Sequence, residues 1–313
     1  MLVEIEKWGS LMSRMILVGV DGTSACHAAI SWAVRRAVSL DSHIVLVHVV
    51  DDEWGMIGGQ SISELHPSAD ALVENDSIFA RSVDPTVSVT TRVLLGDPMV
   101  ELGVASREAD LVVIGTHKTG FLHGRAFGSR SLQLAATAWC PVAVIPEVST
   151  IGRRGIVVGI DDSEAGRAAV RFAAIEAHRA QEELLLLRAW GSSAVGTGSD
   201  AEATDKRARH AHEILGSQSV ALARSAGDDL LVRTRTVRRP AAEALVDASM
   251  SAELLVIGSS RRHGAQMSAL GPVSHDVLLN IAGPTLVVHG DPLADPLADP
   301  VITTLGQSIG RHQ

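Results

Sequence analysis

Cysteine is scarce in this sequence, because Cys26 and Cys140 are the only two in 313 residues. Neither belongs to a C-x-x-C pair, so the chain has no thiols for a disulfide framework or a cysteine-rich zinc site. This scarcity excludes the small disulfide-stapled secreted class and is typical of a protein that works in a reducing cytosol. With 46% hydrophobic residues, the chain has enough apolar side chains for the cores of about two domains.

Positive charge is also in deficit, with 27 Lys and Arg against 36 Asp and Glu and a formal net charge of −9. Such a balance repels phosphate backbones, so nucleic acid is not expected as a partner. One stretch, LLVRTRTVRR at 230–239, is locally basic. Its arginines alternate with Val and Thr at the period of a strand, which predicts an edge strand that exposes its arginines to solvent.

Long apolar runs are missing as well. No run approaches the roughly 18 residues of a membrane span, and the start, MLVEIEKWGSLMSR, lacks the pattern of a signal peptide. We therefore predict a cytoplasmic protein that has no membrane partner. Residues 1–13 are expected to form a loose N-terminal extension, and 291–313, which contain DPLADPLADP, a disordered tail.

Familiar catalytic signatures are absent too. The sequence has no G-x-S-x-G elbow, no Walker A motif and no H-x-x-x-H pair with a nearby carboxylate. Hydrolase and P-loop classes therefore lack their machinery, and no metal ligands are predicted. Asp21, which follows a buried strand pattern, fits an acceptor of hydroxyl hydrogen bonds better than a catalytic acid. We predict a protein without catalytic residues.

What the chain does contain is an internal repeat. The segment from Ile16 to Ala37 parallels the segment from Ile156 to Ala177, a shift of 140 positions. Later in the repeat, ADLVVIGTH at 109–117 parallels AELLVIGSS at 252–260, a shift of 143. Two related domains are therefore predicted, at 14–148 and 153–290, with about three extra residues in the middle of the second.

Within each copy, short apolar runs alternate with helical patterns, as expected for βα units. In the first copy we expect strands near 15–20, 43–49, 87–94, 110–115 and 142–145. Ala29, Ala33 and Ala37 recur at helical spacing and should form a buried face. The predicted fold is α/β: two tandem flavodoxin-like (Rossmann-like) doubly wound domains, each with a five-stranded parallel sheet of order 3-2-1-4-5.

In such a sheet a ligand binds beyond the carboxyl ends of strands one and four, where the strand order reverses. The loop after the fourth strand of copy one has glycines at 115, 120, 124 and 128. Backbone amides, the hydroxyls of Ser129 and Ser131, and the charges of Lys118 and Arg125 predict a phosphate site there. An ordinary glycine-rich surface loop is the alternative.

Several short motifs together resemble one family. They are the Asp that ends strand one in each copy, His-Val-Val-Asp at 48–51, Gly-Asp-Pro at 96–98, Ile-Gly-Thr-His at 114–117, Phe-Gly-Ser at 127–129 and Cys-Pro-Val at 140–142. Over about residues 14–290 the chain resembles a tandem member of the universal stress protein family. ATP-binding members have G-2x-G-9x-G-[S/T] after strand four, and this chain has Lys118 at the middle glycine with the spacing intact.

The resemblance implies a set of nucleotide contacts in each copy. In copy one it places Asp21 near the ribose, Val49 beside the adenine and the glycine loop near the phosphates. Copy two departs further, with Arg261 at the middle glycine and Pro272 in place of Ser or Thr, so copy one is expected to be the better site. The implied residues are Gly19, Val20, Asp21, Val49, Ile114, Gly115, His117, Lys118, Gly120, Gly128, Ser129, Arg130 and Ser131 in copy one, and Asp161, Gly258, Gly271 and Ser274 in copy two.

The function implied is that of a cytoplasmic, non-catalytic stress-response regulator that binds an adenine nucleotide, ATP with or without Mg²⁺, mainly in domain 1. Its occupied state would shift its conformation or its binding to an unidentified protein partner. The alternative is a nucleotide-free scaffold, and a slow ATPase is the weaker third hypothesis. Members of the family dimerise through the last strand, so 142–145 and 285–289 are expected to pair, within one chain or in a homodimer.

Overall fold

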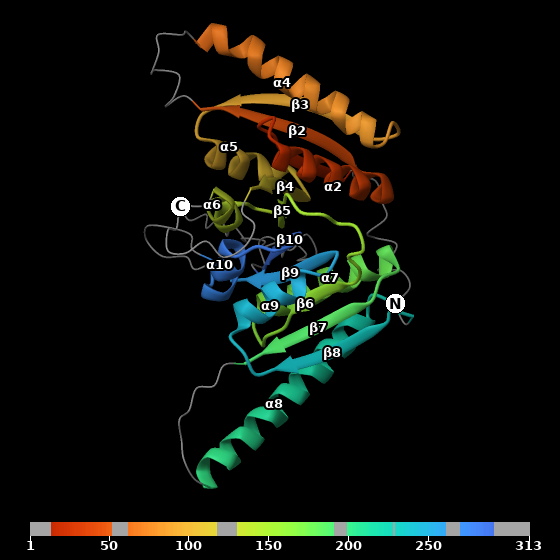
Figure 1. Ribbon diagram of the computed structural model, residues 1–313, viewed down its shortest axis with the longest axis vertical. Helices are drawn as coiled ribbons and strands as arrows, with labels where there is room; N and C mark the ends of the chain where they lie inside the picture. The colour runs from red at the N-terminus through yellow and green to blue at the C-terminus, as the bar shows by residue number, and fades with distance from the viewer. Residues whose placement is uncertain are drawn as a thin grey trace, which may run out of the picture.

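The computed structural model describes residues 14–51, 62–117, 130–190, 199–227, 229–260 and 270–290. Each half of the chain contributes five strands, which lie across the long axis of the molecule and follow one another along it (Figure 1). In the first half these are β1 (Met15–Gly19), β2 (His43–Val50), β3 (Ser88–Leu95), β4 (Leu111–Thr116) and β5 (Val142–Pro146). In the second half they are β6 (Ile156–Gly159), β7 (Leu184–Ala189), β8 (Val232–Val237), β9 (Leu254–Ser259) and β10 (Thr285–His289).

The helices alternate with these strands, as the sequence predicted. Thr23 caps the first helix by accepting from the Cys26 amide, and the small residues Ala29, Ala33 and Ala37 lie fully buried along that helix. The helices are α2 (Ser24–Leu40), α4 (Ile62–Val83), α5 (Pro98–Ala105), the short 3₁₀ turn η1 (Ser106–Glu108), α6 (Arg130–Thr137), α7 (Glu164–Ala180), α8 (Ser199–Arg224), α9 (Ala241–Ser249) and α10 (Pro272–Leu279).

The predicted five-stranded parallel sheet of each domain is wrong in extent and in strand direction. All ten strands form one mixed sheet of order β3-β2-β1-β4-β5-β10-β9-β6-β7-β8, in which β5 and β10 are antiparallel. Each half keeps the predicted order 3-2-1-4-5, and its own strands are parallel. The halves join through the largely apolar strands β5 and β10, which this pairing buries completely. Without it, an apolar edge with unpaired backbone groups would face solvent.

Two apolar layers enclose the sheet. Alternate residues of the strands pack against α2, α4, α7 and α8 on one face, and the intervening residues pack against α5, α6, α9 and α10 on the other (Figure 1). Each layer contains residues of both halves. The pairing expected between 142–145 and 285–289 therefore occurs within one chain and has a continuous core.

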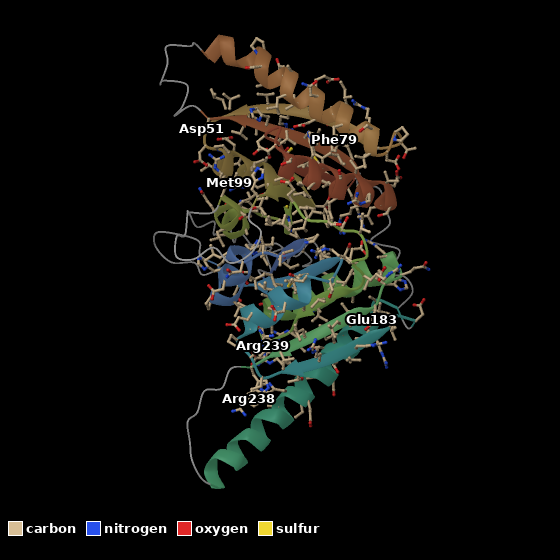
Figure 2. All side chains as sticks on the ribbon, viewed as in Figure 1. Asp51, Phe79, Met99, Glu183, Arg238 and Arg239 are labelled. Atoms are coloured by element: carbon tan, nitrogen blue, oxygen red, sulfur yellow. The ribbon has the colours of Figure 1, made fainter. Side chains whose placement is uncertain are left out.

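The arginine-rich stretch is an edge strand, as predicted. β8 ends the sheet and leaves Arg233 and Arg235 exposed, and Nε of Arg233 lies 3.0 Å from a carboxylate oxygen of Glu183. Figure 2 shows Glu183 at one end of β7 and Arg238 with Arg239 just beyond the other end of β8.

Among the described helices, none is long and apolar enough to span a membrane.

Candidate functional site

The candidate site of the first half lies beyond the ends of β1 and β4, which pair side by side. The chain leaves β1 for α2 on one face of the sheet and leaves β4 for α6 on the other. In doubly wound sheets the ligand crevice lies where the connections diverge in this way, beyond the carboxyl ends of the strands, and we call this edge of each half its crevice. The structure thus brings Asp21, Gly115 and the end of β2 to one edge, as the sequence predicted.

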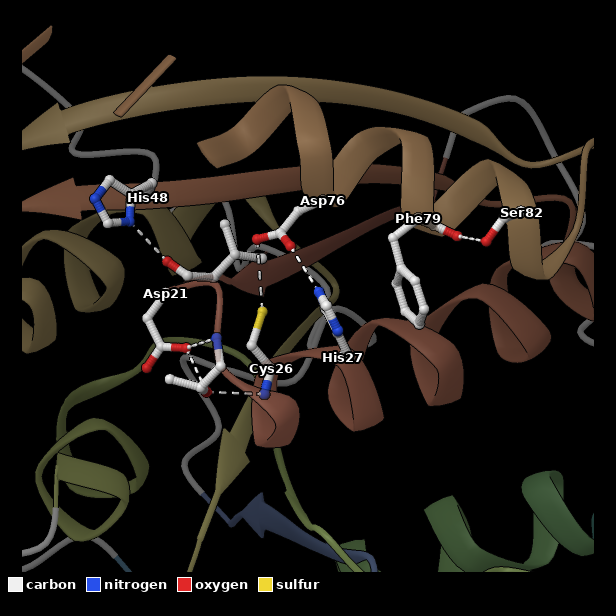
Figure 3. A network of polar contacts seen from close by, with 9 residues as sticks. Asp21, Cys26, His27, His48, Asp76, Phe79 and Ser82 are labelled. Atoms are coloured by element: carbon white, nitrogen blue, oxygen red, sulfur yellow. Dashed lines mark hydrogen bonds and ion pairs between the residues drawn. The ribbon is translucent and has the colours of Figure 1, made fainter. Parts of the chain in front are cut away.

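Asp21 is exposed at this edge, and a turn fixes its orientation. One carboxylate oxygen, Oδ1, accepts from the Thr23 amide at 3.1 Å and from the Thr23 hydroxyl at 2.6 Å (Figure 3). Thr23 in turn caps α2. Within the described residues, no hydrogen bond reaches the other oxygen, Oδ2. Asp21 therefore stabilises the loop and also presents an acceptor to the crevice.

The strand ends beside Asp21 are packed and rigid. The carbonyl of Val20 accepts from Nδ1 of His48 at 2.8 Å, and the Val20 amide donates to the carbonyl of Val47 at 2.9 Å. Val49 is 9% exposed at the end of β2, and Ile114 is buried beside Gly19. These residues can offer an apolar wall, the surface that an adenine ring needs.

Gly115 has a packing role that its motif did not reveal. A Cβ at this position would lie 2.2 Å from the carbonyl oxygen of Ala25, so only glycine lets β4 pass so close to the start of α2. Gly258 repeats this contact in the second half, with its Cβ position 2.4 Å from the Ala165 carbonyl. Both glycines are required by the fold, whether or not a ligand binds.

A carboxylate that sequence reasoning missed lies at the mouth of the first crevice. Oε2 of Glu147 accepts from the Ser24 hydroxyl at 2.8 Å and lies 3.5 Å from Nδ1 of His117. Glu147 follows directly after β5, so its position at the carboxyl edge was the available signal. The corresponding residue of the second half is Gly290, where a Cβ would lie 2.4 Å from the Ala165 amide nitrogen.

The structure describes only the two ends of the glycine loop, up to His117 and from Arg130 onward. Lys118, Gly120, Gly128 and Ser129 lie outside the described residues, as does Arg261 in the second half. Arg130 is exposed at the first position of α6, and Ser131 is buried within it. The phosphate contacts of these loop residues remain predictions.

The second half repeats the frame but uses its polar groups internally. Asp161 accepts from the Ser163 amide at 3.0 Å and hydroxyl at 2.5 Å, as Asp21 does with Thr23. At the start of α10, the Gly271 amide donates to the Ser259 hydroxyl at 3.4 Å, and the Ser274 hydroxyl donates to the Gly258 carbonyl at 3.1 Å. Pro272, the first residue of α10, has no N–H to offer.

A second feature that the sequence did not reveal is a buried carboxylate on α4. Asp76 is 2% exposed; its oxygens lie 3.1 Å from Nε2 of His27 and 3.7 Å from Sγ of Cys26 (Figure 3). The His27 ring stacks on Phe79 at 4.2 Å. This network fastens α4 to the first turn of α2, directly behind the loop of Asp21.

Burial sets the charge state of this network. It raises the pKa of the Cys26 thiol to about 12, with the Asp76 charge adding to the rise and backbone hydrogen bonds opposing it. Burial also raises the pKa of Asp76, and the hydrogen bond from His27 opposes that shift. Cys26 therefore stays a thiol near neutral pH. In the described part of the chain, no group of three or more His, Cys, Asp or Glu side chains is arranged to hold a metal.

The fold defines the class: a duplicated, doubly wound α/β protein whose halves are joined in one sheet. Comparison with known proteins agrees, because the model of the universal stress protein family matches residues 12–146 and again 152–289. The chain belongs to this family. The universal stress protein Rv2623 of Mycobacterium tuberculosis is 30% identical over 294 residues, which cover 87% of this chain and 95% of that protein.

A solved structure shows the same fold. A universal stress protein from Archaeoglobus fulgidus has a TM-score of 0.65 at 15% identity, covering 90% of this chain and all of that one, 100%. A family protein from Arabidopsis thaliana, solved with AMP bound, covers 44% of this chain and 95% of its own length, at 18% identity and a TM-score of 0.33.

Proposed function

We propose that the first half of this universal stress protein binds an adenine nucleotide, with ATP and its Mg²⁺ as the candidate ligand, and that the protein is a non-catalytic stress-response regulator of the cytoplasm. The observation that supports this most is the placement of Asp21. Its carboxylate lies at the switch point of the sheet, is oriented by Thr23, and has its Oδ2 unbonded within the described residues. A ribose hydroxyl is a natural donor for that oxygen.

The other groups at this edge suit the chemistry of a nucleotide. Val49 and Ile114 supply apolar surface next to Asp21, and α6 begins on the far side of the glycine loop. A helix start of this kind, with Ser131 in its first turn, favours an anion such as a phosphate group. Glu147 lies beside Ser24. Its negative charge repels a bare phosphate but attracts the divalent cation that arrives with ATP.

A regulator that binds without turnover is also what the nearby reactive groups support. The Cys26 thiol contacts a carboxylate rather than a histidine, and at a pKa of about 12 it is not a nucleophile at neutral pH. His27, which has Asp76 as its carboxylate partner, stacks on Phe79 between α2 and α4 instead of facing the crevice. We therefore assign no general base to bound ATP.

Titration calorimetry of the full chain with ATP and Mg²⁺ tests this proposal, and Asp21→Ala and Asp161→Ala form a matched pair. Each removes a carboxylate that holds the cap of its helix, so both should lower the melting temperature similarly. Only Asp21→Ala should weaken binding, by about tenfold or more, as expected for a lost charged hydrogen bond. AMP and cyclic AMP, titrated in parallel, rank the nucleotides.

Absence of heat and of a thermal shift at millimolar nucleotide would refute nucleotide binding. Equal losses of affinity in the two variants would instead refute the assignment to the first half. Steady hydrolysis at rates of ordinary enzymes, about 1 s⁻¹ or faster, would overturn the non-catalytic assignment.

A nucleotide-free scaffold is the second candidate function, and the pairing of β5 with β10 favours it. The hydrogen-bonded pairing within the ten-stranded sheet fixes the two halves relative to each other. If this candidate is correct, partner capture by the purified protein will be unchanged by ATP, AMP or Asp21→Ala.

A further inference from the structure

The seam between the halves has a local two-fold symmetry. In the antiparallel pair of β5 and β10, Ala143 lies opposite Leu286, and these are the same position of the repeat, 143 residues apart. The flanking pairs, Val144 with Thr285 and Val142 with Val287, are exchanged by the same operation. A pseudo-two-fold axis therefore passes between Ala143 and Leu286.

The two residues on this axis differ in size. Both side chains are fully buried in the layer that packs against α2 and α7. Alanine leaves space on one side of the axis, and leucine fills it from the other. Two alanines would leave a void here, and two leucines would compete for one volume.

The helices that cover the seam show the same asymmetry in charge. Arg36 of α2 and Glu176 of α7 are equivalent positions, 140 residues apart, and form an ion pair across the seam. Their side chains are 13% and 10% exposed. The guanidinium of Arg36 also lies 5.5 Å from the centre of the Trp32 ring and 5.7 Å from that of Phe172, a second equivalent pair.

Neighbouring charges extend this complementarity. The first half adds Arg35 near the seam, and the second half adds Glu253. Burial raises the pKa of Glu253, with Glu182 and Glu176 adding to the rise, whereas Arg35 opposes it. The second half is the acidic side of the seam, and it also carries a cation there. A guanidinium nitrogen of Arg179 lies 3.8 Å from a carboxylate oxygen of Glu176.

We propose that this seam is selective for unlike halves: the α2 and β5 face of the first half accepts the second half of the same chain and rejects a copy of itself. In a symmetric pairing, residues on the axis meet their own copies. First halves would place Arg36 against Arg36, and second halves Glu176 against Glu176. A buried like-charge contact is costly, so the preference for the unlike half comes from repulsion as well as attraction.

A charge-swap cycle on the full chain tests the proposal. Arg36→Glu and Glu176→Arg should each lower the melting temperature by about 5 °C or more, since each leaves buried like charges. The double variant restores an unlike pair and should recover at least half of the summed loss. Arg171→Glu, the same substitution at an exposed position of α7, is the control and should change the melting temperature by about 1 °C or less.

Additive losses in the double variant, or a loss for Arg36→Glu no larger than for Arg171→Glu, would overturn the proposal. If either reversal prevents folding, Arg36→Gln, Glu176→Gln and their combination give the same cycle with milder changes. Light scattering adds a direct readout, because the wild type should have the mass of one chain. A wild-type dimer that Arg36→Glu dissociates would also overturn the proposal.

Discussion

The two halves of this protein share their framework and differ in the groups that a ligand would use. Both end the first strand with an aspartate that accepts from the helix-capping residue, and both need a glycine where the fourth strand passes the first helix. In the second half, the Gly271 amide and the Ser274 hydroxyl are bonded within the protein, and Pro272 stands where the first half has Ser129. The framework residues therefore occur in both copies, whereas the sequence of the expected phosphate loop differs.

The two packing glycines, Gly115 and Gly258, should respond to substitution with similar losses of stability. Gly115→Ala and Gly258→Ala each force a Cβ to within 2.4 Å or less of backbone carbonyl atoms. We expect each to lower the free energy of unfolding by about 3 kcal/mol, the upper range for overpacking, as measured by urea denaturation. Gly271→Ala is the control, because its Cβ would meet nothing within 4 Å. A loss at Gly115 alone would break the equivalence of the two frameworks.

The helix caps should separate stability from binding. Thr23→Ala and Ser163→Ala each remove a side chain that caps its helix and holds the aspartate. Both should lose about 1 kcal/mol of stability, measured by thermal melts. Only Thr23→Ala should also weaken nucleotide binding, because it frees Asp21, and Thr23→Ser should restore both properties. Weakened binding in Ser163→Ala would show that the second half takes part.

The buried Asp76, which has Ser219 as its counterpart in the repeat, predicts a smaller, pH-dependent difference. Because the folded-state pKa of Asp76 is raised above its unfolded value, its contribution to stability is lost as pH rises through the folded pKa. Asp76→Asn has no carboxyl to ionise at this position, so it does not lose this stability as pH rises. The urea midpoint of the variant relative to wild type should therefore increase from pH 3.5 to pH 5.5, and a constant difference would contradict the shift.

Asp84 provides a control of opposite sign. Hydrogen bonds from the Thr86 side chain and backbone lower the pKa of this exposed carboxyl, so its contribution is present above the unfolded pKa and lost as pH falls. Asp84→Asn should therefore become worse than wild type as pH rises over the same interval. If the urea midpoints of the two variants, each relative to wild type, change in the same direction with pH, then global charge and not the local environment controls the trend.

Much of the fold was predictable from the sequence, because its signals are local. Apolar runs located the five strands of the first copy, and the alanine spacing of α2 identified its buried face. The repeat and the strand order within each half were likewise correct. The single ten-stranded sheet was not fixed by these local signals, since Ala143–Leu286 and Arg36–Glu176 become partners only when two distant segments meet.

The position of the candidate site was predictable from the sequence, but the packing roles of its individual residues were not. Asp21, Val49 and Gly115 lie at one edge because parallel strands end together. The sequence could not show that Gly115 is required by the Ala25 carbonyl, since glycine in a motif and glycine in close packing look alike. Asp76 was missed because a single carboxylate on an amphipathic helix gives no sign of being buried.

The proposed inequality of the two sites can be tested by counting bound nucleotides. Equilibrium dialysis of the full chain against saturating labelled ATP and Mg²⁺ gives the number of nucleotides per chain directly. One per chain, lost in Asp21→Ala and retained in Asp161→Ala, is the predicted result. Two per chain, or one that is lost only in Asp161→Ala, would contradict the assignment of the nucleotide to the first half.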